Sequence, residues 1–416
     1  MNDMLGYSHF LYLAYIYISI IISVSSSLYI LFIFYFHKKK EKTGLNKDTK
    51  DSLTILIPVY NEDKKLFERC IESVKKQQTK FIVIGNGCYS PYKEITESSG
   101  GKFIYLNKNA GKKGALATGI KLIKSRYVMF LDSDTILPKK AAENLISKFD
   151  DKTAGVGAEV RIIKERDKFV YYPSEMLQRL RQLSFKAMSY FDRVLVISGQ
   201  CAVYRTDIIK DFVSSDDFLN SRFLGKKMII GDDITITKYV NSLGYKTKIA
   251  QNVVVFTKGQ KSFKSLVKQS IRWSRSGYIN FINSLRDKSL FRNGPVYAFF
   301  LLYIYTLPFL VLAEFILRGG LLARIIFRRG IMVAESIVVN SLFSVPRFLQ
   351  SFSAFYTGLK IVSILSGLIM IYLIVKTMKK DKLRLLSYGS IMLLVMFITA
   401  LYAIFSLNKH DRWLTR

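Results

Sequence analysis

The chain begins with a long apolar segment and ends with several more. No charged residue interrupts residues 10–36, which as one helix would be about 40 Å long and able to cross a bilayer. Apolar stretches at 296–317, 352–375 and 385–407 predict further spans. The stretch at 321–343 is apolar but carries arginines and a glutamate, so it either lies in the membrane interface or faces an aqueous conduit.

Basic residues set the expected topology. Lysines follow the first apolar segment at 38–40, so the amino terminus is predicted outside and the next domain in the cytosol. Basic clusters at 376–384 and 409–416 also favour the cytosol. Both cannot be inside if 385–407 crosses the membrane once, so either that segment re-enters without crossing or 321–343 does not span.

Between these ends, short apolar runs alternate with helical patterns. Strand alternating with helix predicts an α/β fold built on a mostly parallel, doubly wound sheet. The predicted strands are 53–59, 80–84, 102–106, 128–131 and 157–162, with two more short strands around a glycine turn in 194–205. The predicted helices are 64–78, 118–124, 141–149, 174–189, 234–243 and a basic amphipathic one at 262–283.

A pair of acids, Asp132 and Asp134, ends the predicted strand 128–131. The carboxyl edge of an open α/β sheet is where ligands bind. Carboxylates one residue apart can share a hard divalent cation that completes its shell with substrate phosphate oxygens. The pair therefore suggests a nucleotide diphosphate site, although alone it is also typical of a solvated turn.

Two further clusters carry candidate chemistry. Lys112 and Lys113 lie in a Gly-Lys-Lys-Gly segment that opens a helix, a place suited to phosphate, although a plain basic loop is equally consistent with it. Asp232 and Asp233 form a second acid pair at a helix start, where the alternative role is capping of the helix.

Composition narrows the classes of function. Of the 416 residues half are hydrophobic, and 63 Lys and Arg against 31 acids give a net charge of +32. Such a balance suits an anionic bilayer face or a polyanionic substrate. Scattered basic residues without a recognition motif argue against nucleic acid. The three cysteines lack metal-ligand spacing and fit a reduced domain.

The motifs taken together resemble those of a known family. Asp132-Ser133-Asp134, the 198–205 segment, Gly231-Asp232-Asp233 and Gln269-Ser270-Ile271-Arg272-Trp273 occur in the order found in processive membrane-embedded family-2 glycosyltransferases. These are the hyaluronan, chitin and cellulose synthases. The ending Trp413-Leu414-Thr415-Arg416 is similar to the carboxyl-terminal motif of hyaluronan synthases and nodulation chitin-oligosaccharide synthases.

The resemblance implies a GT-A-type catalytic domain and a role for each motif. Asp132 would contact the nucleotide of a UDP-sugar, Asp134 would hold Mg²⁺ or Mn²⁺ on the diphosphate, and Asp233 would be the general base with Asp232 in support. The remaining donor contacts would be Lys112, Lys113, Asn86, Trp413, Thr415 and Arg416. The implied acceptor contacts are Gln269, Arg272, Trp273, Glu159, Ser198, Gly199 and Cys201.

One departure from the family pattern concerns the donor. The family commonly has an acid at the end of the second strand for the uracil and ribose, but residues 83–88 contain none and Asn86 takes that place. The glycine common inside the terminal motif is Leu414 here, as in the nodulation enzymes, which favours N-acetylglucosamine as the donor sugar.

These features predict an inverting transferase in the plasma membrane that polymerises a β-linked glycan from a UDP-sugar, with a growing glycan as acceptor and no nucleic acid partner. The oligomeric state is left open. The alternative is a non-processive enzyme that adds one sugar to a polyprenyl phosphate or glycolipid, and a non-catalytic scaffold or transporter is a third possibility.

The sequence predicts five segments: a spanning helix (1–37), a cytosolic catalytic domain (51–255), interfacial helices (256–293), a transmembrane region (294–408) and an active-site tail (409–416).

Overall fold

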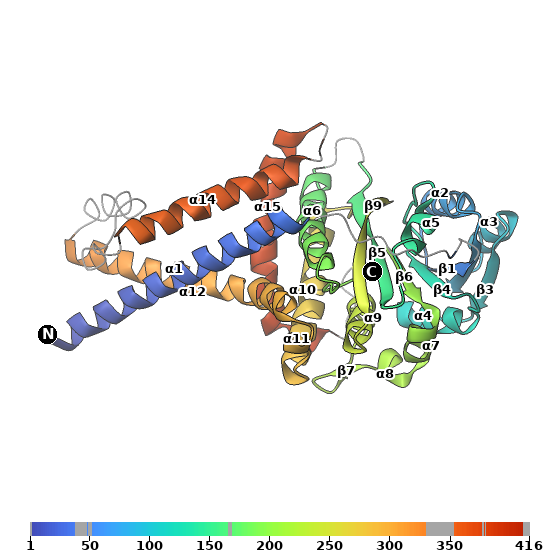
Figure 1. Ribbon diagram of the computed structural model, residues 1–416, viewed down its shortest axis with the longest axis horizontal. Coiled ribbons are helices and arrows are strands. Elements are labelled where there is room, and N and C mark those ends of the chain that lie inside the picture. Colours follow the sequence, from blue (N-terminus) through green and yellow to red (C-terminus); the bar gives the residue numbers. More distant parts are fainter. Residues whose placement is uncertain are drawn as a thin grey trace. The chain divides into compact units, whose positions relative to one another are not determined.

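The computed structural model describes residues 2–37, 48, 52–164, 169–329, 353–376, 378 and 380–410. These residues form two compact units. One contains α1 (Asn2–Phe36) up to Phe34, α12 (Pro295–Arg329) from Phe299, and α14 (Ser353–Lys376). The other contains the remaining described residues, including α15 (Lys382–Phe405) and a short 3-10 helix, η3 (Leu407–Lys409). Figure 1 follows the chain through both units.

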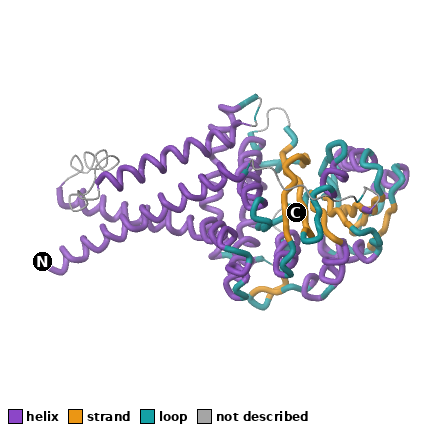
Figure 2. The backbone as a smooth tube through the Cα atoms, in the orientation of Figure 1, coloured by secondary structure: helices purple, strands orange, loops and turns teal. Residues whose placement is uncertain are grey.

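A seven-stranded sheet, drawn in orange in Figure 2, is the framework of the second unit. Its strand order is β3-β2-β1-β4-β6-β5-β9, and every described neighbour pair is parallel except those that involve β6. The predicted mostly parallel α/β sheet is thus confirmed. The strands are β1 (Leu53–Val59), β2 (Lys80–Asn86), β3 (Lys102–Leu106), β4 (Tyr127–Leu131), β5 (Thr153–Ile162), β6 (Cys201–Arg205) and β9 (Lys246–Thr257), with a separate hairpin of β7 (Arg222–Phe223) and β8 (Lys226–Lys227).

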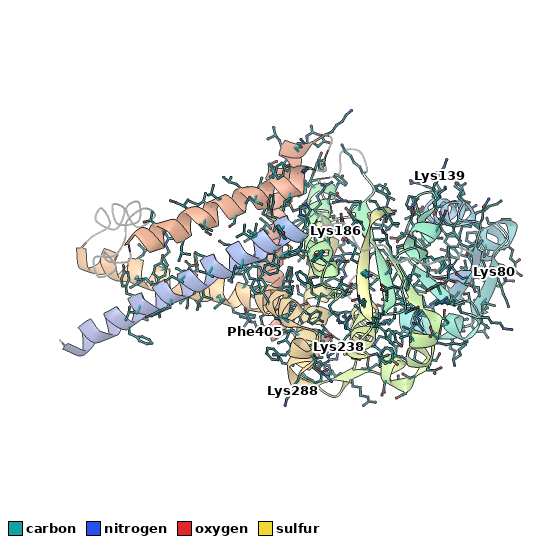
Figure 3. The ribbon with its side chains drawn as sticks, in the orientation of Figure 1. Lys80, Lys139, Lys186, Lys238, Lys288 and Phe405 are labelled. Atoms are coloured by element: carbon teal, nitrogen blue, oxygen red, sulfur yellow. The ribbon has the colours of Figure 1, made fainter. Side chains whose placement is uncertain are left out.

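Helices cover both faces of this sheet. The group α2, α3 and α5 packs on one face, where apolar side chains of α2 and α5 share a buried core with β1, β4, β5 and β9, and α4, α7 and α9 lie on the other (Figure 1). The helices are α2 (Lys64–Lys75), α3 (Tyr92–Ser98), α4 (Gly111–Lys121), α5 (Ala141–Ile146), α6 (Tyr171–Ser189), α7 (Thr206–Ser214), α8 (Asp216–Leu219), α9 (Asp232–Ser242), α10 (Phe263–Arg286) and α11 (Ser289–Arg292). Helix α9 also contacts the end of α10, since Lys238 of α9, labelled in Figure 3, forms an ion pair with Asp287, the residue that follows α10.

The helix α4 begins earlier in the chain than the sequence pattern predicts. The sequence predicts a helix at 118–124, whereas α4 begins at Gly111 and ends at Lys121. Two asparagine side chains stabilise the beginning of α4. Asn86 Oδ1 accepts a hydrogen bond from the Ala110 N–H, and Asn109 Oδ1 accepts one from the Gly111 N–H. Inside the helix, a Cβ at Gly119 would overlap Leu56 of β1. Glycine therefore lets α4 lie directly on the sheet.

The prediction of two strands in 194–205 is half wrong. Only β6 forms, opposite Leu131 and its neighbours in β4. The run before it is buried, but its backbone N–H groups bond to side chains: Val194 donates to Thr247 Oγ1 and Ile197 donates to Thr237 Oγ1. Threonine hydroxyls thus take the place of a neighbouring strand.

Among the described residues, four helices are long and apolar enough to cross a membrane: Phe10–Phe36, Pro295–Ala323, Thr357–Lys376 and Lys382–Phe405. They agree with the predicted spans, while most of 321–343 lies outside the described residues. In the first unit, Tyr29 stacks on Tyr303 at 4.2 Å between ring centroids, and Ser19 Oγ donates to Glu314 Oε1 at 2.7 Å.

The fourth of these helices, α15, packs in the second unit. Leu385, Gly389, Met392 and Val395 recur at helical spacing and are buried, and the ideal Cβ position at Gly389 lies 3.0 Å from Met176 Cε of α6. The predicted interfacial helix is α10, which begins with a capping box of Ser262 and Ser265. Its Arg275 is buried and donates to Ser406 Oγ and to the carbonyl oxygen of Lys409, so α10 also holds the residues that follow α15.

Candidate active site

The first acid pair lies at the carboxyl edge of the central strand β4, as predicted. Asp132 and Asp134 line a cavity of about 670 Å³. The turn that carries them is closed by the Thr135 N–H, which donates to the carbonyl oxygen of Asp132. Glu62, after β1, lines the same cavity and accepts from Ser133 Oγ at 3.5 Å. Two parallel strands therefore deliver three carboxylates to one edge of the sheet.

The surroundings of Asp134 suit a divalent cation. Burial, followed by the negative charges of Asp132 and Glu62, raises the pKa of Asp134 to about 7. An anion there is costly unless a cation compensates it. The residues that the structure describes contain no group of three His, Cys, Asp or Glu side chains arranged to enclose a metal ion. The donor set fits a cation held by one carboxylate and completed by substrate oxygens, which is the usual arrangement for Mg²⁺ with phosphates.

Lys112 connects the two acid pairs. Its Nζ lies 2.7 Å from Asp132 Oδ1 and 3.3 Å from Asp232 Oδ2. Burial alone would lower the pKa of Lys112, but Asp132 and Asp232 together raise it above its ordinary value. The Lys112 side chain is therefore protonated, and it lies between the end of β4 and the start of α9.

The second acid pair begins α9 and is not a simple helix cap. The N-cap residue is Gly231, which has a φ of 78° and no room for a Cβ beside Ser276 of α10. Asp233 Oδ1 accepts from the Ile234 N–H at 2.8 Å, and its Oδ2 lies 3.4 Å from the Gly199 N–H. The turn before β6 and the start of α9 thus orient Asp233 together.

The two members of this pair have opposite protonation tendencies. Burial would raise the pKa of Asp232, but Lys112 lowers it below its ordinary value. Burial and the charge of Asp232 raise the pKa of Asp233. Neighbouring carboxyl groups whose pKa values are pushed apart are typical of a site that divides charge stabilisation from proton transfer.

The other end of the cavity is formed by α6 and α10. Gln269, Arg272 and Trp273 of α10 line it, as the sequence predicts. The guanidinium of Arg181 on α6 lies over the Trp273 ring, 4.2 Å from its centroid. The guanidinium therefore covers one face of the indole.

Several predicted site residues do not line this cavity. Lys113 donates to Ser221 Oγ and to the carbonyl oxygen of Met228, and burial lowers its pKa to about 8. Glu159 forms ion pairs with Arg161 and with Lys186, which is labelled in Figure 3. These side chains hold neighbouring elements together rather than opening onto the cavity.

The segment around Gly199 contributes one residue directly. Gly199 lines the cavity, and a Cβ there would lie 3.0 Å from Lys112 Nζ. Ser198 and Cys201 are buried beside it but are not among the lining residues. Burial raises the pKa of the Cys201 thiol to about 12, which leaves it an inert packing group.

Asn86 lines the cavity, but its amide is already used. Nδ2 donates to Asn109 Oδ1, and Oδ1 accepts from the Ala110 N–H, each at 2.8 Å. It therefore shapes the loop that leads into Lys112. The predicted contacts Trp413, Thr415 and Arg416 lie outside the described residues.

Sequence reasoning missed Glu62, Gln178 and Arg181, all of which line the cavity. Glu62 could have been found, since it follows a predicted parallel strand at the ligand-binding edge. Gln178 and Arg181 have no such signal, because they reach the cavity only through tertiary packing, in which α6 and α10 both pack against α15.

Comparison with known proteins agrees with this geometry. Residues 54–213 match the sequence profile described as "Glycosyl transferase family 2". The chain carries a family-2 glycosyltransferase domain. It is related to hyaluronan synthases: it is 31% identical to human hyaluronan synthase 3 over 186 residues, which are 43% of this chain and 33% of that protein. The corresponding identity to Xenopus laevis hyaluronan synthase 2 is 29% over 186 residues.

The matched region spans about a third of the length of these relatives, because 33% of each is covered. Among solved structures, the mannosyltransferase PcManGT from Pyrobaculum calidifontis, in complex with GDP-Man and Mn²⁺, has a TM-score of 0.57 at 14% identity. The match covers 86% of this chain and 98% of that one. The fold is therefore GT-A-like, as the motifs predict.

Proposed function

We propose that the protein is an inverting, processive glycosyltransferase that builds a β-linked polysaccharide from a UDP-sugar, with UDP-N-acetylglucosamine or a related UDP-hexose as donor. The observation that carries this proposal is the single cavity that joins Asp132, Asp134 and Lys112 to Asp233 and to Trp273. One end of it suits a nucleotide diphosphate, and the other suits a sugar acceptor.

The donor end would bind the leaving group. Asp132 would contact the nucleotide and Asp134 would hold Mg²⁺ or Mn²⁺, which when bound stabilises negative charge on the departing diphosphate. Lys112 already has a compensating anion on each side, Asp132 and Asp232. A shift of its ammonium toward the phosphates would add positive charge as the bond to UDP breaks.

Asp233 would be the general base. Its raised pKa strengthens it as a proton acceptor, and the contacts from Ile234 and Gly199 fix its orientation. It would take the proton of an acceptor hydroxyl as that oxygen attacks the sugar C1. The new C1–O bond forms while the bond from C1 to the UDP oxygen breaks, and direct displacement inverts the configuration at C1.

The acceptor would lie on the α10 end of the cavity. An indole face offers a sugar ring an apolar surface with a fixed orientation, so Trp273 would support the terminal sugar, with Gln269 and Arg272 beside it. The predicted tail contacts Trp413, Thr415 and Arg416 remain part of the proposal as groups that would close over the diphosphate.

The apolar helices support a place in the membrane. We assign the catalytic domain, 51–255, to the cytosolic side of the plasma membrane, where UDP-sugars are available, and the helices at 1–37 and 294–408 to the bilayer. A growing glycan made at this face would be passed across the membrane between helices.

The test uses purified full-length protein in nanodiscs with Mn²⁺ and a panel of UDP-sugars, and follows UDP release and sugar incorporation. We expect release with one or two donors and incorporation into a glycan. Release that is matched by one sugar on a lipid would favour the non-processive alternative. No turnover with any nucleotide sugar would contradict the proposal.

A further inference from the structure

The cavity has a wall that no sequence motif marks. The first half of α6 contributes Ser174, Leu177, Gln178 and Arg181 to its lining. These residues recur at intervals of three and four, so they form one face of the helix. The α10 residues Gln269, Arg272, Trp273 and Ser276 line the same cavity, and the stacking of Arg181 on Trp273 joins the two walls.

Polar groups on this wall are buried without partners. Ser174 and Gln178 are 4% and 3% exposed. Ser174 Oγ and Gln178 Oε1 have no hydrogen-bond partner among the described residues. Buried polar atoms are nearly always hydrogen-bonded in native proteins, so an unsatisfied group beside a cavity is a place where a polar ligand binds.

The chemistry of this wall is that of a carbohydrate site. An amide and a hydroxyl exchange hydrogen bonds with neutral hydroxyl or acetamido groups, and neither supplies the charge that would select a phosphate. The wall also has the right length: seven residues separate Ser174 from Arg181, about 10 Å of helix axis at the usual rise per residue. That distance accommodates two sugar rings in line.

We infer that the Ser174–Gln178 face of α6 is a second acceptor subsite, which binds the sugar unit next to the one on Trp273. The inference rests on the proposed transferase activity and adds to it a second binding site for the acceptor. The acceptor is then a glycan of at least two units that is held by hydrogen bonds along α6, and Arg181 marks the boundary between the two subsites.

Helix α6 also provides a matched control. Gln182 lies one turn after Gln178, is 2% exposed, and has no partner for either amide atom within the described residues, yet it does not line the cavity. Replacing either glutamine by leucine keeps the approximate volume and removes an unsatisfied amide oxygen, so both variants should fold with a Tm close to that of the wild type.

The experiment measures the KM for β-linked N-acetylglucosamine oligomers of one to six units, with the donor that turns over in the panel above. For the wild type we expect KM to fall roughly tenfold from the monosaccharide to the disaccharide, the effect of one good extra contact set. Gln178→Leu and Ser174→Ala should lose most of that gain, and Gln182→Leu should retain it.

Two results would overturn the inference while the transferase activity stands. One is a wild-type KM that does not depend on acceptor length. The other is an equal loss in Gln178→Leu and Gln182→Leu. If the wild type transfers sugar from no donor at all, the proposed function fails, and the subsite falls with it.

Discussion

At the scale of residues, Lys112 decides how charge is distributed in the site. It neutralises Asp132 and lowers the pKa of Asp232, while Asp233 keeps a raised pKa. Lys112 thus stabilises the anionic form of Asp232, while the adjacent Asp233 remains the stronger base.

The first prediction concerns that base. Asp233→Asn keeps the size of the side chain but removes its capacity to take a proton, so turnover should fall by about 10²–10⁴-fold, the usual contribution of a general base. Isothermal titration should give unchanged UDP affinity, since the donor residues are intact. A variant with near wild-type turnover would exclude Asp233 as the base.

The second prediction concerns pH. Transfer needs ionised Asp233, whose raised pKa places the acid limb of the kcat/KM profile above the ordinary value for an aspartate. Asp232→Asn removes the neighbouring charge that helps to raise this pKa, so the acid limb should move to lower pH. Asp207→Asn, which changes an acid paired with Arg205 outside the cavity, should leave the limb in place, and a shift to higher pH in Asp232→Asn would contradict this account.

At the scale of elements, the placement of α4 and α10 matters most. Lys112 reaches both acid pairs only because α4 begins at Gly111 and lies directly on β1 through Gly119. Trp273 meets Arg181 because α6 and α10 both pack against α15.

The third prediction tests the packing of α4. Gly119→Ala introduces a Cβ that overlaps Leu56, and such overpacking costs about 1–3 kcal/mol. The Tm should fall, and turnover should fall with it as Lys112 moves. Lys121→Ala, at an exposed position on the same helix, is the control and should change neither; equal behaviour of the two variants would rule out the packing argument.

The fourth prediction tests the link between α10 and the chain after α15. Arg275→Met removes the hydrogen bonds to Ser406 Oγ and the Lys409 carbonyl oxygen. Bonds of this charged kind contribute about 1.5–3 kcal/mol each, so the Tm should fall clearly in a thermal scan. Arg286→Met changes a largely exposed arginine at the end of the same helix and should have little effect.

Local pattern predicted most of the sheet, because β1 and β3 are continuous apolar or alternating runs bounded by turns. The sequence pattern also located both acid pairs, because one pair follows a predicted strand and the other begins a predicted helix. It failed where tertiary contacts determine the structure. Threonine hydroxyls bond the backbone of 194–197, which does not form a strand, and α6 brings Gln178 and Arg181 to the cavity through its packing against α15. Lys113 was placed at the phosphates by its sequence position, but its helix directs it to Ser221 and Met228.

At the scale of the whole molecule, the part of the chain that the structure describes combines a GT-A-like domain with four helices long and apolar enough to cross a membrane. The central claim is that this combination polymerises a sugar. The most direct measurement is the size distribution of the product, by gel and mass spectrometry, made by the purified protein in nanodiscs with Mn²⁺ and its donor while most acceptor remains unused. We predict long chains beside unextended acceptor, with none formed by Asp233→Asn. Products extended by a single sugar, however long the reaction runs, would contradict the account.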